Sequence, residues 1–182
     1  IIAFGEDRYN IDFARKIIEE YDDEENDLKL IIHIENKDLE ILFHTKFVNK
    51  NEKKINIKTF SFYEEVAKDL FSKYSIDGDT MNYIESNKEL KSIVIGNGIL
   101  IEKIIYQMAL ISHLPNENIH TITIIDKEAD KLLLKIKKVL YYKEENFPTL
   151  KLESINLDKD NLEFYNSYIW QVNTKESNLV NV

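Results

Sequence analysis

The stretch that decides the fold is residues 92–126, SIVIGNGILIEKIIYQMALISHLPNENIHTITIID. An apolar β-branched run, residues 93–95, leads into the glycine turn 96–98, and apolar residues at helical spacing follow. A second β-branched run, residues 122–125, is closed by Asp126. The pattern predicts a strand, a glycine turn, a helix, a strand and an acid, which is typical of a Rossmann-type unit.

The glycine turn and the acid together are suited to a nucleotide. Gly96 and Gly98 let the backbone turn sharply and come close to a ligand, and the free N–H groups at the helix start favour a phosphate. A carboxylate at the place of Asp126 can accept both hydroxyls of a ribose. Ile101 stands where the complete fingerprint has a third glycine. A turn that has only a structural role would have the same sequence, so a nucleotide site and a purely structural turn both stay open.

Composition narrows the class of protein. The chain of 182 residues is 43% hydrophobic and 31% charged, as in ordinary globular domains, and its net charge of −9 argues against nucleic-acid binding. The lack of cysteine excludes disulfides, thiolate nucleophiles and cysteine-ligated zinc, and fits a cytoplasmic location. No apolar run is long enough to span a bilayer and no signal peptide is recognisable. Because Ile1 opens an apolar run, we expect a piece of a longer protein.

Strands and helices alternate along the chain. The predicted strands are residues 1–5, 30–34, 55–62, 93–95, 122–125 and 150–157, with helices between them and a polar loop at 6–10. This alternation predicts an α/β fold, a Rossmann-like doubly wound parallel sheet of about six strands. Residues 1–74 are expected to form the back half, 75–91 a linker, and 92–182 the front half with the glycine turn.

The order of the halves is permuted. Residues 1–5 match 93–96 in kind, and the strand that ends at Glu35 matches the strand that ends at Asp126, yet the half with the glycine turn comes second. The chain is therefore either cut from two tandem domains or a rearranged copy of one. A lone three-stranded half would leave an open edge, so we expect the halves to pair, within one chain or between two.

Four stretches resemble the regulator-of-potassium-conductance (RCK, or TrkA-N) domains of bacterial potassium channels and transporters. They are SIVIGNGILIEKII, ITIIDKEAD, VIIAFGEDRYNIDFARKII across the two termini, and LIIHIENKDLEILF. Residues 60–74 also look like the sixth strand and crossover helix through which two such domains dimerise. The resemblance implies a cytoplasmic, ligand-sensing and non-catalytic domain, a homodimer or higher oligomer that acts on the membrane subunit of a channel or transporter.

The resemblance also implies where a ligand would lie. NAD(H) or an adenine nucleotide would place its phosphates on Gly96, Asn97 and Gly98 and its ribose on Asp126. The loop after the family's fourth strand would lie across the crevice, and its short polar residues match Gly5, Glu6, Asp7 and Asn10.

Other functions are weighed against this one. A ligand-free module for dimerisation would fit the same sequence, and a small NAD-dependent oxidoreductase is the third alternative, although no second domain supplies a substrate pocket. The four histidines show no zinc spacing, and His33 is expected to be a satisfied core residue. The acidic runs 22–25 and 158–160 are expected to be solvated loops, and the aromatic cluster around Trp170 to be packing.

Overall fold

The computed structural model describes residues 1–22, 26–49, 54–76, 89–112, 119–140, 146–158 and 180–181. The chain divides into two compact units, unit 1 (Ile1–Val66) and unit 2 (Ala67–Val182). The division falls inside the helix α3 (Phe62–Lys73). Each unit has its own parallel sheet and its own apolar core.

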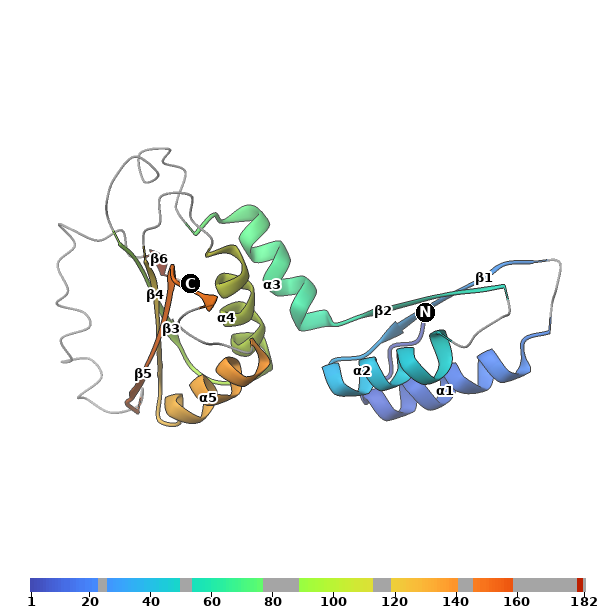
Figure 1. The fold of residues 1–182 in the computed structure, drawn as a ribbon. Helices are drawn as coiled ribbons and strands as arrows, with labels where there is room; N and C mark the ends of the chain where they lie inside the picture. Colours follow the sequence, from blue (N-terminus) through green and yellow to red (C-terminus); the bar gives the residue numbers. More distant parts are fainter. Residues whose placement is uncertain are drawn as a thin grey trace. The chain divides into compact units, whose positions relative to one another are not determined.

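Unit 1 is a small parallel sheet with helices packed against it (Figure 1). The strands β1 (Leu28–His33) and β2 (Ile55–Phe60) pair in parallel, and Ile2 forms an isolated parallel bridge to Ile32 on the other edge of β1. The helices are α1 (Asp7–Glu20), α2 (Lys37–Phe43) and the π-helical turn η1 (His44–Val48).

The apolar core of unit 1 is formed by residues that recur every second position along the strand and every turn along the helix. Leu30 and Ile32 alternate with more exposed residues along β1 and are buried. Ala14 and Ile18, one turn apart on α1, are buried in the same cluster, together with Phe43 at the end of α2. One face of the β1 strand therefore meets one face of each helix, as the alternation predicts.

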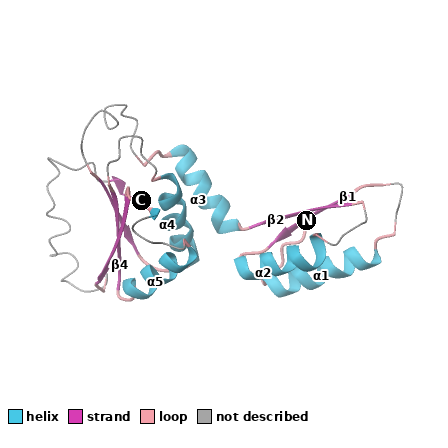
Figure 2. Cartoon of the chain, viewed as in Figure 1, coloured by secondary structure: helices cyan, strands magenta, loops and turns pink. Residues whose placement is uncertain are grey.

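Unit 2 is a four-stranded parallel sheet in the order β5-β4-β3-β6. Its elements are β3 (Leu90–Ile95), α4 (Ile99–Ile111), β4 (His120–Asp126), α5 (Ala129–Val139), β5 (Leu150–Asn156) and the two-residue β6 (Val180–Asn181). The helices α4 and α5 lie on the same side of the sheet (Figure 2), and buried residues of both share one core with β3, β4 and β5.

The strand order of unit 2 reverses at β3. From β3 the chain moves outward through β4 to β5, and β6 then pairs in parallel with the opposite edge of β3. In open α/β sheets such a reversal opens a crevice beyond the carboxyl ends of the strands, where ligands bind. The turn that follows β3 therefore lies at a switch point of the sheet.

A buried histidine ties three elements of unit 2 together. His120 is fully buried; its Nε2 lies 2.8 Å from Ser92 Oγ on β3, and its Nδ1 lies 2.6 Å from Ser112 Oγ after α4. Ser112 donates its own proton to the Met108 carbonyl oxygen, so Nδ1 carries the imidazole proton and Ser92 donates to Nε2. Burial lowers the pKa of His120 to about 4.

The parallel α/β class predicted from the sequence is confirmed, but one sheet of six strands is not what the described residues form. The strands fall into two sheets, and the predicted first strand, residues 1–5, is reduced to the single bridge at Ile2. The polar loop predicted at residues 6–10 is wrong, because α1 begins at Asp7, where an acid suits the positive helix end. Most of the predicted linker and the aromatic cluster around Trp170 lie outside the described residues.

Candidate functional site

The glycine turn after β3 has the backbone that its sequence predicts. Gly96 has φ +119° and Gly98 has φ +123°, values that side chains with a Cβ rarely adopt. The Gly96 N–H donates to the Ile125 carbonyl oxygen at 2.9 Å, which fixes the turn beside the end of β4. A Cβ on Gly96 would lie 3.9 Å from Ile101 Cγ1, so the isoleucine in place of a third glycine packs against the turn without crowding it.

The start of α4 is open. Gly98 is the N-cap residue, and no side chain caps the helix. Asn97 and Gly98 are exposed, and the Asn97 side-chain oxygen accepts the Gly98 N–H at 2.7 Å. An exposed helix start with a positive dipole end and a side-chain acceptor that can rotate away is chemically able to receive an anion.

Asp126 lies next to this turn. Ile95 and Ile125 are paired in the register of β3 and β4, so the residues that follow them, Gly96 and Asp126, end neighbouring strands at the same edge of the sheet. One carboxylate oxygen of the half-buried Asp126 accepts the Glu128 N–H at 3.0 Å. The other oxygen has no partner among the described residues, and it is the group that would accept a hydroxyl.

The end of β5 is closed by its own contacts. Ser154 donates to Asp130 at 2.6 Å, Asn156 donates to the same carboxylate, and the Asp130 N–H donates to the Asn156 side-chain oxygen at 3.1 Å. The hydrogen bonds from Ser154 and Asn156 lower the pKa of Asp130. This corner holds the start of α5 against β5. Among the described residues of the same edge, Asn97 and Gly98 are exposed and Asp126 keeps one oxygen without a partner.

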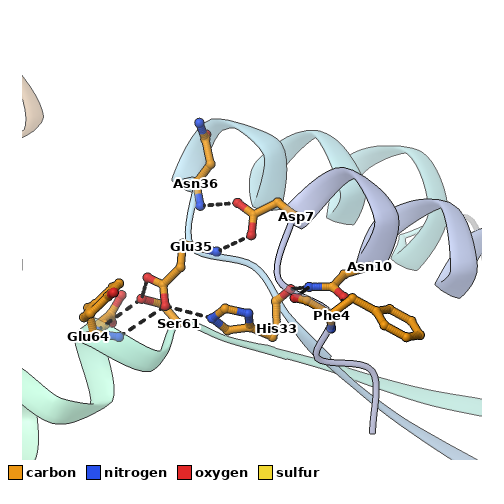
Figure 3. A network of polar contacts seen from close by, with 9 residues as sticks. Phe4, Asp7, Asn10, His33, Glu35, Asn36, Ser61 and Glu64 are labelled. Atoms are coloured by element: carbon orange, nitrogen blue, oxygen red, sulfur yellow. Dashed lines mark hydrogen bonds and ion pairs between the residues drawn. The ribbon is translucent and has the colours of Figure 1, made fainter. Parts of the chain in front are cut away.

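In unit 1 the predicted ligand residue Asn10 is a buried structural residue that links two backbone segments (Figure 3). Its side chain is fully buried; its oxygen accepts the Phe4 N–H at 2.6 Å, and its nitrogen donates to the carbonyl oxygens of Phe4 and His33 at 3.1 and 2.9 Å. These contacts tie the segment after Ile2 to the end of β1. They use both N–H groups of the amide, and the buried side chain is not accessible to a ligand.

Asp7 is also used within unit 1. Its carboxylate accepts the N–H groups of Glu35 and Asn36, at 3.0 and 2.8 Å, in the loop that follows β1 (Figure 3). Asn36 in turn caps α2 by accepting the N–H groups of Asp38 and Leu39. Gly5 and Glu6 are exposed, and the Glu6 side chain makes no cap bond to α1.

The acid at the end of β1, Glu35, holds the start of α3. Its carboxylate accepts hydrogen bonds from Ser61 Oγ at 2.6 Å and from the Tyr63 N–H at 3.2 Å, and it lies 2.8 Å from His33 Nε2. Burial alone would raise the pKa of Glu35, but the hydrogen bonds from Ser61, His33 and the start of α3 lower it. Ser61 accepts the Glu64 N–H at 3.2 Å, so an acid and a serine together cap this helix.

The structure therefore separates the predicted site residues into two groups. It brings Gly96, Asn97, Gly98 and Asp126 together at one sheet edge of unit 2. Gly5, Glu6, Asp7 and Asn10 all lie in unit 1, and Asp7 and Asn10 bond to their own unit. Sequence analysis found neither cap of α3; Ser61 followed three residues later by Glu64 was the signal for the serine cap, and the sequence holds no such signal for Glu35.

No group of three or more histidine or acidic side chains is placed to hold a metal ion in the part of the chain that the structure describes. His33 is half-buried and partnered by Glu35, in keeping with a satisfied histidine. Among the described helices none is long and apolar enough to cross a membrane. Most of the acidic runs 22–25 and 158–160 lies outside the described residues.

Comparison with models of protein families, with curated proteins and with solved structures found no match to this chain.

Proposed function

We propose that this chain is a regulatory domain that binds a nucleotide at the carboxyl edge of the unit 2 sheet. The observation that carries the proposal is the coincidence of three features at one place: a turn with two positive-φ glycines, a switch point of the strand order, and a partly free carboxylate on the neighbouring strand. Phosphate would bind at Gly96–Gly98 and the start of α4, and ribose at Asp126.

We further propose that the two units are the complementary halves of a Rossmann-like sheet in permuted order. In unit 2 the order β5-β4-β3-β6 has the form of strands three, two, one and four. In unit 1 the order Ile2, β1, β2 has the form of strands four, five and six. The position of strand four is thus filled by a short element in each unit, β6 in unit 2 and the bridge at Ile2 in unit 1. This supports the proposal that the two units are halves cut from, or rearranged within, a Rossmann-like sheet.

The resemblance to RCK domains supports the choice of a sensor over an enzyme. On this proposal the domain acts on the cytoplasmic side of a potassium channel or transporter, and its ligand is NAD(H) or an adenine nucleotide. Such a domain would regulate by changing between two conformations. A ligand can shift the equilibrium between them by no more than the difference in its affinity for the two. Asp7 and Asn10 serve as scaffold here, because their polar groups bond to unit 1 itself.

The alternative is a module that holds subunits together and binds no nucleotide. Melting temperatures measured with NAD, NADH, ATP, ADP and AMP separate the two, because a ligand that binds only the folded state raises the midpoint. A ligand at about 100 times its Kd adds about 2.7 kcal/mol to the free energy of unfolding. A rise with one of the five supports the sensor. Unchanged midpoints with all five, in a chain that still self-associates, favour the module.

A further inference from the structure

The glycine turn contains an asparagine that is followed directly by a glycine. Asn97-Gly98 is the one such pair in the sequence, although the chain holds many other asparagines. An asparagine in this context is chemically labile, because the backbone nitrogen of the next residue can attack the carbon of the side-chain amide. Glycine permits this attack best, since it has no Cβ to block the approach and leaves the backbone free to close a ring.

The two reacting groups lie against each other in the structure. The side-chain oxygen of Asn97 lies 2.7 Å from the backbone nitrogen of Gly98, so the amide carbon that bears this oxygen is next to the nitrogen that would attack it. Gly98 precedes the first turn of α4, and its N–H donates to no backbone carbonyl oxygen in the part of the chain that the structure describes. The hydrogen bonds of helix and sheet therefore do not hold this nitrogen away from the amide.

Asn97 also differs from other asparagines in its surroundings. Asn97 and Gly98 are both exposed, so water and base reach them. Asn10 is fully buried, and three hydrogen bonds hold its amide group. Asn56 on β2 is exposed, but the next residue is Ile57, whose branched side chain hinders the attack. Asn97 thus combines a labile sequence, exposure to water and contact between the reacting groups.

We propose that Asn97 deamidates spontaneously in the folded protein and that the product blocks the anion site at the start of α4. The Gly98 nitrogen loses its proton to solvent base and bonds to Cγ of Asn97. The bond from Cγ to the amide nitrogen breaks, and this nitrogen takes up a proton and leaves as ammonia. Water then opens the five-membered imide at either carbonyl, which leaves aspartate or isoaspartate at position 97. Water is the only co-reactant.

Either product carries a carboxylate in place of a neutral amide. The positive end of α4 attracts the new charge, so the carboxylate occupies the place proposed for phosphate and repels a second anion. In isoaspartate the backbone runs through the former side chain, and the added methylene group moves Gly98 relative to Gly96. Nucleotide binding would therefore decline with the age of the protein molecule. This consequence rests on the proposed function, whereas the deamidation itself does not.

Peptide mass mapping of the full chain tests the modification without any ligand. The wild type is incubated at mildly acidic and mildly alkaline pH, circular dichroism confirms that it stays folded, and the peptides that contain Asn97 and Asn56 are then quantified. Enzymatic methylation detects isoaspartate. We expect conversion of Asn97, faster at alkaline pH because the attacking nitrogen must lose a proton, and no conversion of Asn56 in the same time. Asn97→Gln should stay unmodified, because it would have to form a larger ring.

An amide at Asn97 that persists in the folded chain, but is lost from the chain unfolded in urea, would overturn the proposal, because the fold would then protect this residue. Conversion of Asn56 as fast as Asn97 would also overturn it, since the reaction would not depend on the glycine turn.

Isothermal titration calorimetry tests the effect on binding, with whichever of the five nucleotides raises the melting temperature most. Deamidated wild type, and the variant Asn97→Asp that mimics one product, should bind at least about tenfold more weakly than fresh wild type. Asn97→Gln should keep its own starting affinity through the same incubation. Equal affinities of fresh and deamidated wild type would show that the modification does not block the site. Fresh wild type that binds none of the five would refute the proposed function and the blocking together, while the peptide masses still decide whether Asn97 deamidates.

Discussion

Gly96 donates its backbone N–H to the carbonyl oxygen of Ile125 at 2.9 Å, and this bond places the glycine turn directly beside Asp126. It extends the pairing of β3 and β4 by one step beyond their last paired residues, Ile95 and Ile125. The backbone hydrogen bonds that pair β3 with β4 therefore also fix the positions of the turn and of Asp126. A nucleotide site at this edge would need no rearrangement of the strands to form.

The glycine turn should not tolerate a side chain. Gly98→Ala places a Cβ on a residue with φ +123°, where strain of about 1–3 kcal/mol is expected even though no heavy atom lies within 4 Å. Gly5→Ala is the matched control, because Gly5 also has open space but no positive φ, and it should change stability by less than about 0.5 kcal/mol. Urea unfolding measures both. Equal effects would show that backbone strain is not what selects glycine at the turn.

Asn10 should be important for stability rather than for ligand binding. Asn10→Ala leaves the Phe4 N–H and the Phe4 and His33 carbonyl oxygens without their partner, at a cost of about 3 kcal/mol. The exposed Asn56 on β2 gives the matched control Asn56→Ala, which should cost less than about 0.5 kcal/mol. If Asn10→Ala keeps wild-type stability but loses nucleotide affinity, the assignment of Asn10 as a buried structural residue is wrong.

His120 should make the protein sensitive to mild acid. Its pKa is about 4 in the folded state, below the ordinary value of 6.5, so between these values only the unfolded chain takes up the proton and stability falls as the pH falls. The full loss below pH 4 is about 3 kcal/mol, and above pH 6.5 this residue contributes no pH dependence. Urea unfolding at pH 7.5 and 5.0 measures the fall, and His120→Gln should flatten it. An NMR titration showing the imidazole charged at pH 5.5 would contradict the buried neutral histidine.

Glu35 should stabilise α3 through its charge. Glu35→Gln keeps the shape of the side chain but loses the anion at the helix start, and we expect a loss of about 1 kcal/mol. Because the folded-state pKa is lowered, this contribution is present above the ordinary value of 4.5 and disappears as the pH falls through the folded value. The difference in unfolding free energy between wild type and variant should therefore shrink below pH 4.5. A constant difference would mean that the charge is not the cause.

The sequence predicted the elements of unit 2 well because they depend on local pattern. The run 93–95, the turn 96–98 and the apolar helix period became β3, its turn and α4, and Asp126 ends β4 as expected. A buried strand and a two-glycine turn have few alternatives, so their identity does not depend on distant residues. The same holds for α5 and β5.

The fate of single polar residues could not be predicted in the same way. Asp7 and Asn10 were expected to be ligand residues because the resemblance to RCK domains implies short polar residues in the loop across the crevice. Asp7 instead bonds to Asn36 and Asn10 to His33, in a segment more than twenty residues away. His120 is in phase with the buried Ile122 and Ile124 along β4, but nothing in the sequence indicates its two serine partners, because they lie on other elements. The pairing of polar groups depends on tertiary structure, and it cannot be predicted from the spacing of residues along the chain.

Isothermal titration calorimetry of Asp126→Asn tests the central claim most directly, with whichever of the five nucleotides raises the melting temperature most. The asparagine oxygen can still accept the Glu128 N–H, so the local turn is kept while the carboxylate charge is lost. We predict an affinity at least about tenfold weaker than wild type, with Glu89→Gln, an exposed acid at the opposite end of β3, unchanged. Wild-type affinity in Asp126→Asn would contradict a nucleotide site at the edge shared by Gly96 and Asp126.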